Sequence, residues 1–177
     1  MGYNWSKAIM TDNRPEAKRD QSEARHHWIN EDLVIIPMQA NSAEEAIAQL
    51  GARLEAAGRV KATWAQAAIE REKTFATGLP TPEVGVAIPH TDVDHVLQEA
   101  IAVGVLQEPV AFGEMGNPDN TVPVKIVCAL AVAQSELLVT LLQQLVEMFQ
   151  NPGVLTAIAN AQTPSEIVEL FEHHIQI

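Results

Sequence analysis

Short hydrophobic runs and amphipathic stretches alternate along the chain from Asp32 to the C-terminus. The hydrophobic runs predict strands at 33–38, 83–88, 100–106 and 124–132. The last run is continuously apolar, which is typical of a central strand buried on both faces. Pro37 places the first strand at a sheet edge or at a strand end, because proline cannot donate to a strand ladder. The Gly- and Pro-rich segment 109–123 predicts a loop-rich connection, with a short strand at 110–112 as an option.

Helices are predicted where apolar residues recur at helical spacing behind a capping residue. Capping boxes stand at Ser42-x-x-Glu45, Thr63-x-x-Gln66 and Thr163-x-x-Glu166. The predicted helices run from Ser42 to Gly58 and over 64–75, 135–150, 154–161 and 163–174, with a short helical turn from Asp92. Alternating helices and strands without repeats predict the α/β class, with one sheet covered by helices.

The first 31 residues differ from the rest of the chain. Residues 1–31 are polar and mixed in charge, with no sustained apolar period, so they predict a disordered or loosely attached arm. The pair His26-His27 is interpreted as solvated arm residues. The remaining 32–177 has the size of one ordinary domain.

Composition narrows the possible partners and location. The net charge of −12 argues against binding to nucleic acid or to anionic membrane surfaces. The longest apolar runs, such as Ile126–Ala133, fall short of the ~20 residues that a membrane-spanning helix needs, and no signal peptide is evident. The single cysteine, Cys128, lies in an apolar run and predicts a buried side chain, with no internal disulfide. We therefore expect a cytoplasmic protein.

The candidate chemistry centres on His90, which ends the strand Gly85-Val-Ala-Ile-Pro-His90. Pro89 stiffens the backbone there, and a neutral imidazole can act as nucleophile, acid or ligand. A turn histidine with no role is the alternative. If His90 carried a phosphoryl group, that group would need cations and N–H donors. Arg71 could supply the cation, and the backbone of Thr91 and Asp92 the donors.

Two competing interpretations concern the neighbours of His90. Arg71 could instead be a solvated helix residue paired with Glu70 or Glu72. His95, five residues after His90, could join it at a turn, and Asp92 and Asp94 could then complete a metal site. No metal-ligand spacing pattern is present, so no metal is predicted.

The pair His173-His174 falls in the last turn of the last predicted helix. A cationic imidazole is favoured there by the helix dipole, so the pair needs no further role.

These residues together resemble a known family. Glu70-Arg71-Glu72-Lys73, a loop, Val86-Ala-Ile-Pro-His90, the strand 124–132 and a helix opening at Ser135-Glu136 are similar to IIA proteins of the fructose–mannitol class. These belong to the phosphoenolpyruvate-dependent sugar phosphotransferase system. The resemblance covers about residues 32–177. It implies one mixed sheet with helices on both faces, His90 as phosphoacceptor and Arg71 as phosphate support.

Two positions depart from the family pattern. Many members place glycine after the active histidine, where this chain has Thr91. Many also have a second active-site histidine in a Glu-His pair, where Leu137 follows Glu136 here. In having His95 five residues after His90, the chain looks most like the galactitol-type branch. His95 could replace the missing histidine or could be a surface turn residue.

The resemblance implies a phosphotransferase relay that needs no cofactor in this protein. His90 would accept a phosphoryl group from the carrier HPr and pass it to a cysteine of a IIB component during uptake of a sugar or sugar alcohol. The alternative is a regulatory module like the nitrogen-related IIA proteins, which bind partners according to phosphorylation state. The absence of histidine at Leu137 weighs mildly against that branch. The sequence does not identify the sugar.

Overall fold

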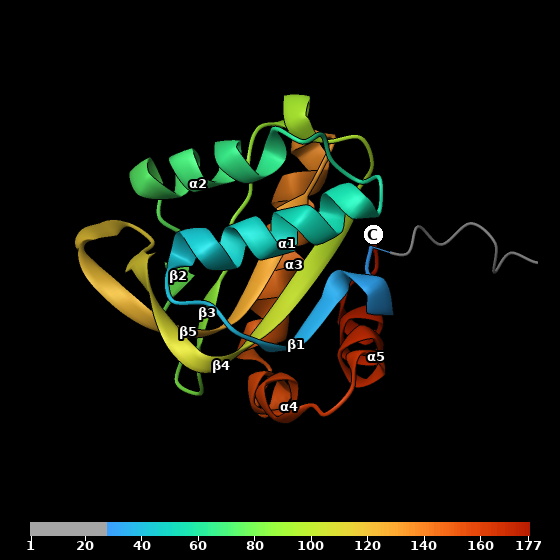
Figure 1. Cartoon of the computed structure of the whole chain (residues 1–177). Coiled ribbons are helices and arrows are strands. Elements are labelled where there is room, and N and C mark those ends of the chain that lie inside the picture. The colour runs from blue at the N-terminus through green and yellow to red at the C-terminus, as the bar shows by residue number, and fades with distance from the viewer. Residues whose placement is uncertain (1–27) are drawn as a thin grey trace, which may run out of the picture.

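The computed structural model describes residues 28–177, and one five-stranded sheet lies at its centre (Figure 1). The strands are β1 (Val34–Met38), β2 (Gly78–Leu79), β3 (Gly85–Ala87), β4 (Ala100–Glu114) and β5 (Asn117–Ala131). β1 pairs with β4 and β3 with β5 in parallel, whereas β4–β5 and β2–β3 are antiparallel. The predicted single mixed sheet is confirmed.

Helices cover both faces of this sheet. α1 (Ala43–Ala56) and α2 (Trp64–Thr74) lie on one face, and α3 (Ser135–Gln150), α4 (Val154–Asn160) and α5 (Pro164–His174) lie on the other (Figure 1). Successive residues of β5 point alternately into the two cores: Ile126 packs with the α3 side and Val127 with the α1 side. This explains the continuous apolar run and confirms the prediction of a central strand. Cys128 is fully buried, as predicted.

Two of the three predicted capping boxes begin their helices. The Ser42 hydroxyl accepts from the Glu45 N–H at 3.1 Å, and the Thr163 hydroxyl accepts from the Glu166 N–H at 3.4 Å. The helix predicted behind the third box, α2, begins at Trp64 as predicted, but without a capping box. Thr63 has helical backbone angles (φ −80°, ψ −12°) and its side chain makes no cap hydrogen bond. Its hydroxyl instead lies against the ring of His95.

The loop predicted over 109–123 is wrong, although the optional strand at 110–112 does form, as part of β4. β4 and β5 continue as one long hairpin whose turn is formed by Met115 and Gly116, and Gly116 has the positive φ (79°) that favours glycine. A register shift between Val105 and Val110 accommodates Pro109, which is where sheets tolerate proline. At the end of β4, Glu114 pairs with Gly78 of β2, so the hairpin turn returns toward the end of α2.

Packing begins before residue 32. Trp28 and Ile29, which the sequence placed in the polar arm, are buried in the core on the α3 side. The Trp28 carbonyl accepts from the Ile101 N–H, and its indole N–H donates to the carbonyl of Ile177 at 3.2 Å. The folded domain therefore includes Trp28 and Ile29, because both side chains pack in its core. Residues 1–27, including His26-His27, lie outside the described part of the chain.

The remaining turns are short. Within residues 28–177 there are two 3₁₀ turns. η2 (Glu31–Leu33) precedes β1, and η3 (Val93–His95) follows His90. η3 confirms the helical turn predicted from Asp92. None of the helices in residues 28–177 has both the length and the apolar character needed to cross a bilayer.

Candidate functional site

His90 emerges at the edge of the sheet where two parallel strands end. It follows β3 and forms an isolated parallel bridge with Leu130, whose N–H donates to the Pro89 carbonyl at 2.9 Å. β5 ends one residue later, and the 16-residue α3 begins at Ser135. Because the carboxyl ends of parallel strands share one sheet edge, His90 and the N-terminus of α3 lie at the same edge. A helix N-terminus there favours negative charge.

The imidazole of His90 is held in one orientation by its own backbone. Its Nδ1 lies 2.9 Å from the carbonyl oxygen of Ile88. A carbonyl only accepts, so the proton resides on Nδ1 and the lone pair of Nε2 stays available. Burial lowers the pKa of His90, and the charge of Arg71 lowers it further, against the raising effects of the Ile88 hydrogen bond and Asp92. The ring is therefore neutral at neutral pH and can act as a nucleophile.

Arg71 lies in the last turn of α2, beside the turn that follows His90. Its Nη1 is 3.5 Å from Oδ1 of Asp92, and its guanidinium carbon is 5.1 Å from the centroid of the Phe75 ring. Its Nε is buried and has no hydrogen-bond partner among the described residues. The Arg71 guanidinium therefore has an N–H donor that no described residue uses and that an anion could accept.

The helix neighbours that could have paired with Arg71 have other partners. Glu70 accepts from Lys73 at 2.8 Å and from Gln66 at 3.0 Å. Glu72 points to Thr77 instead. The alternative in which Arg71 is a solvated helix residue paired with Glu70 or Glu72 is thus not the arrangement in this structure.

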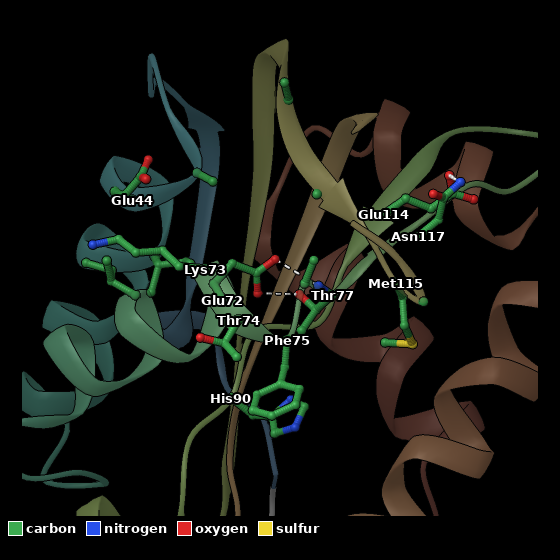
Figure 2. A pocket seen from close by; sticks show the side chains of 17 residues that line it. Glu44, Glu72, Lys73, Thr74, Phe75, Thr77, His90, Glu114, Met115 and Asn117 are labelled. Carbon is green, nitrogen blue, oxygen red and sulfur yellow. Dashed lines mark hydrogen bonds between the residues drawn. The ribbon is translucent and has the colours of Figure 1, made fainter. Parts of the chain in front are cut away.

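Glu72 and Thr77 form a contact that the sequence did not reveal. The Glu72 carboxylate accepts from the backbone N–H and from the hydroxyl of Thr77, both at 2.8 Å (Figure 2). Thr77 is only 3% exposed, and burial raises the pKa of Glu72 despite these two hydrogen bonds. The contact, here termed the Glu72–Thr77 clasp, fixes the turn that carries Phe75. A glutamate five residues before a threonine is too common a spacing to have predicted it.

A cavity of about 580 Å³ opens beside His90 between the end of α2, the start of α1 and the β4–β5 turn. Figure 2 shows Phe75 and His90 together at one end, with Glu44 and Lys73 on one side and Met115 on the other. The Phe75 side chain is 61% exposed and that of Met115 is 42% exposed. His90 therefore borders a surface with large apolar side chains.

His95 contacts a different part of α2. Its Nδ1 is 2.8 Å from the Thr63 hydroxyl, and its carbonyl accepts from the Lys61 N–H at 2.9 Å. Thr63 precedes the first residue of α2, whereas Arg71 lies eight positions later, about 12 Å along a helix axis. His95 is not among the residues that line the cavity beside His90. The structure thus brings Arg71 and Asp92 together and places His95 with Thr63.

The other predicted residues have simpler surroundings. Thr91 directly follows the bridge at His90. The backbone N–H of Asp92 has no hydrogen-bond partner within residues 28–177. In that same part of the chain, no three His, Cys, Asp or Glu side chains come together to hold a metal ion. The rings of His173 and His174 meet edge to face, with centroids 5.0 Å apart, in the last turn of α5.

The fold is that of the mannitol-type IIA components. The crystal structure of IIA mannitol from Escherichia coli superposes with a TM-score of 0.67 at 26% identity, over 80% of this chain and 97% of that one. IIA mannitol in its complex with phosphorylated IIB mannitol, also from Escherichia coli, gives 0.68 at 25% identity, over 82% and 97%. These likenesses define a class of phosphotransferase components.

The family is established by a match to nearly the whole described chain. The family "Phosphoenolpyruvate-dependent sugar phosphotransferase system, EIIA 2" matches residues 27–174, and the chain belongs to it. The galactitol-specific EIIA component of Escherichia coli (strain K12) is 32% identical over 114 residues, which are 64% of this chain and 75% of that protein. The predicted family is confirmed, and the chain is a phosphocarrier of a sugar phosphotransferase relay.

Proposed function

We propose that His90 is the phosphoacceptor of this carrier, receiving the phosphoryl group from HPr and passing it to a cysteine of a IIB component. The observation that carries the proposal is the state of the ring. Nδ1 donates to the Ile88 carbonyl, and Nε2 is left with its lone pair. The lowered pKa of His90 keeps that lone pair unprotonated at neutral pH.

The transfer is a simple exchange of bonds to phosphorus. Nε2 of His90 attacks the phosphorus, the N–P bond of the donor phosphohistidine breaks, and the donor nitrogen recovers its lone pair. The Nδ1 proton stays in place, and the Ile88 carbonyl stabilises the positive charge that develops on the ring. In the second transfer a IIB thiolate forms an S–P bond while the Nε2–P bond breaks.

The surroundings supply positioning and charge, which carry most of the catalysis in phosphoryl transfer. Arg71 has an unpartnered buried Nε and serves as the cationic support of the phosphoryl oxygens. The Asp92 N–H, which has no partner among the described residues, and the Thr91 N–H are the proposed backbone donors. The contact with Thr63 supports a structural role for His95.

Two partners must use the same histidine in turn, so their contacts should be short-lived. The exposed Phe75 and Met115 beside His90 suit small apolar interfaces of that kind. For the related IIA mannitol, a complex with phosphorylated IIB mannitol has been solved. By analogy, we assign the surface around His90 to HPr and IIB in succession.

The test is incubation of the full chain with phosphoenolpyruvate, enzyme I and HPr, followed by mapping of acid-labile phosphate. Phosphate on His90 in the parent, and none in His90→Ala, is the expected result. Phosphate on another histidine would overturn the assignment. A mannitol- or galactitol-type IIB with an intact acceptor cysteine, and its Cys→Ser variant, then test the second transfer. Acceptance on His90 without transfer to IIB would favour the regulatory alternative.

A further inference from the structure

We propose that Asp92 is a positioning residue that holds Arg71 before phosphorylation and makes the phosphorylated state of His90 less stable, so that the phosphoryl group is passed on. This inference rests on the proposed role of His90. Its basis is the contact between Oδ1 of Asp92 and Nη1 of Arg71. Asp92 lies two residues after the nucleophile His90 in the sequence.

The Arg71 guanidinium is only partly engaged by this carboxylate. The Nη1–Oδ1 distance of 3.5 Å is long for a charge-assisted hydrogen bond, and the Asp92 side chain is 79% exposed. The Phe75 ring lies against the guanidinium and limits its freedom, while the buried Nε has no acceptor among the described residues. Arg71 is therefore kept near His90 by a weak partner that a stronger anion can replace.

A phosphoryl group on Nε2 would change the balance of charges at this turn. It brings two negative charges, which attract Arg71 and repel the Asp92 carboxylate. The repulsion exists only in the phosphorylated state, because neutral His90 offers the carboxylate no negative charge. The effects of Arg71 and Asp92 on the pKa of His90 have opposite signs, which supports the view that both charges act at the ring.

A relay gains from this arrangement because its intermediate must be neither too stable nor too unstable. Arg71 favours the phosphorylated state, and Asp92 opposes it by competing for Arg71 and by repelling the phosphoryl group. Removing the Asp92 charge should therefore favour the phosphohistidine. Since both side chains are partly or largely exposed, the change should be about two- to five-fold, as for exposed ion pairs.

The experiment measures the equilibrium between phospho-HPr and this protein for the parent, Asp92→Asn and Asp94→Asn. Asp94 is the matched control, because it is exposed, loses the same charge, and has no contact with Arg71. We expect Asp92→Asn to raise the equilibrium constant for phosphorylation about two- to five-fold and to slow the return of the phosphoryl group to HPr. Asp94→Asn should stay close to the parent.

A second measurement separates competition from simple support of Arg71. If Asp92 acts through Arg71, part of the effect of Asp92→Asn should disappear in an Arg71→Ala background. A lowered equilibrium constant in Asp92→Asn would mean that Asp92 only holds Arg71 in place and would overturn the proposal, as would a value equal to that of Asp94→Asn. Failure of the parent to be phosphorylated on His90 would instead count against the proposed function itself.

Discussion

Two histidines five residues apart occupy surroundings of different kinds. The His90 region joins a strand end, the last turn of α2 and the cavity, and its ring uses its own backbone carbonyl as hydrogen-bond partner. The His95 region joins η3 to the start of α2, through a side-chain contact with Thr63 and a backbone contact with Lys61. Both rings make their contact through Nδ1, but only His90 lines the cavity and lies within the influence of the Arg71 charge. In the second region the contacts tie segments of the fold together.

The difference shows why spacing in sequence is a poor guide to shared chemistry here. Extended backbone at Asp92 (φ −66°, ψ 154°) precedes the turn η3, so the chain moves away from the strand edge after His90. Lys61 reinforces that path by donating through its ammonium group to the Asp94 carbonyl at 2.7 Å. Arg71 and Asp92 remain on the His90 side, and His95 is carried to the other end of α2.

The largest effect should come from removing the nucleophile. His90→Ala should abolish phosphate acceptance from phospho-HPr, because no other group replaces Nε2 at that position. The fold should persist, since His90 is only half-buried and its bridge to Leu130 uses backbone atoms. Radiolabelled phosphoenolpyruvate and circular dichroism measure the two properties. Stable phosphorylation of the variant would place the chemistry outside the His90 region.

Arg71 should contribute the next largest effect. Arg71→Ala removes one charge-assisted contact, worth about 1.5–3 kcal/mol, so transfer should slow by about one to two decades if the contact acts on the transition state. Arg71→Lys keeps the charge but not the planar geometry, so its transfer rate should lie between those of the parent and Arg71→Ala. Rapid-quench measurement of phosphate acceptance checks the order. Transfer by Arg71→Ala at the parental rate would make Arg71 a surface residue.

The Glu72–Thr77 clasp should influence the site through Phe75 and the end of α2. Thr77→Val removes a buried hydroxyl that donates to the half-buried Glu72 carboxylate, and should lower the free energy of unfolding by about 1–3 kcal/mol. We also expect acceptance to slow a few-fold, because the turn that carries Phe75 loosens. Thr77→Ser keeps the hydroxyl and is the control. Urea unfolding and transfer rates, measured on both variants, reveal whether stability and rate change together.

Much of this architecture follows from sequence patterns that carry local information. The continuous apolar run of β5 and the cap at Ser42 marked their elements because burial on two faces and hydroxyl capping leave clear signatures. The β4–β5 hairpin did not, because Pro109 and the glycines near the turn have the same composition as a loop. Only the register shift, which depends on strand pairing, accommodates them.

The site could be predicted only in part, for a similar reason. His90 and Arg71 could be proposed as site residues because the order of a charged helix, a loop and a Pro-His strand end is visible in the sequence. The roles of Phe75 and Asp92 around Arg71 depend on how α2 meets the turn after His90, which is a tertiary contact. Thr63 was assigned to a helix cap because Gln66 follows it at capping-box spacing, but its hydroxyl forms a hydrogen bond with the His95 ring instead.

The protonation of His90 gives a smaller but direct test of its surroundings. Burial lowers the pKa of His90 below its ordinary value of 6.5, so between the two values the unfolded chain binds more protons than the folded one. The free energy of unfolding should therefore fall as pH drops from about 6.5 through the lowered pKa, and rise again with pH. His90→Asn should lack this contribution. An NMR titration of the ring protons reports the pKa itself, and a value at or above 6.5 would contradict the described environment.

The smallest effect on transfer is expected at His95, and it tests the comparison from the other side. His95→Ala should change phosphate acceptance less than two-fold, because its ring contacts Thr63 and not the His90 cavity. It should cost stability of about 0.5–1.5 kcal/mol, the usual net value of one hydrogen bond. Thr63→Val, which removes the same contact from the other partner, is the matched control and should give a similar loss.

If His95 instead replaces the missing auxiliary histidine at Leu137, His95→Ala should slow transfer at least ten-fold while Thr63→Val does not. His95→Gln, which keeps a donor, should then be milder than His95→Ala in transfer rate. If His95→Ala and Thr63→Val are equally stable but only His95→Ala transfers slowly, His95 belongs to the His90 site. If both variants transfer at the parental rate and lose the same stability, His95 has a structural role only.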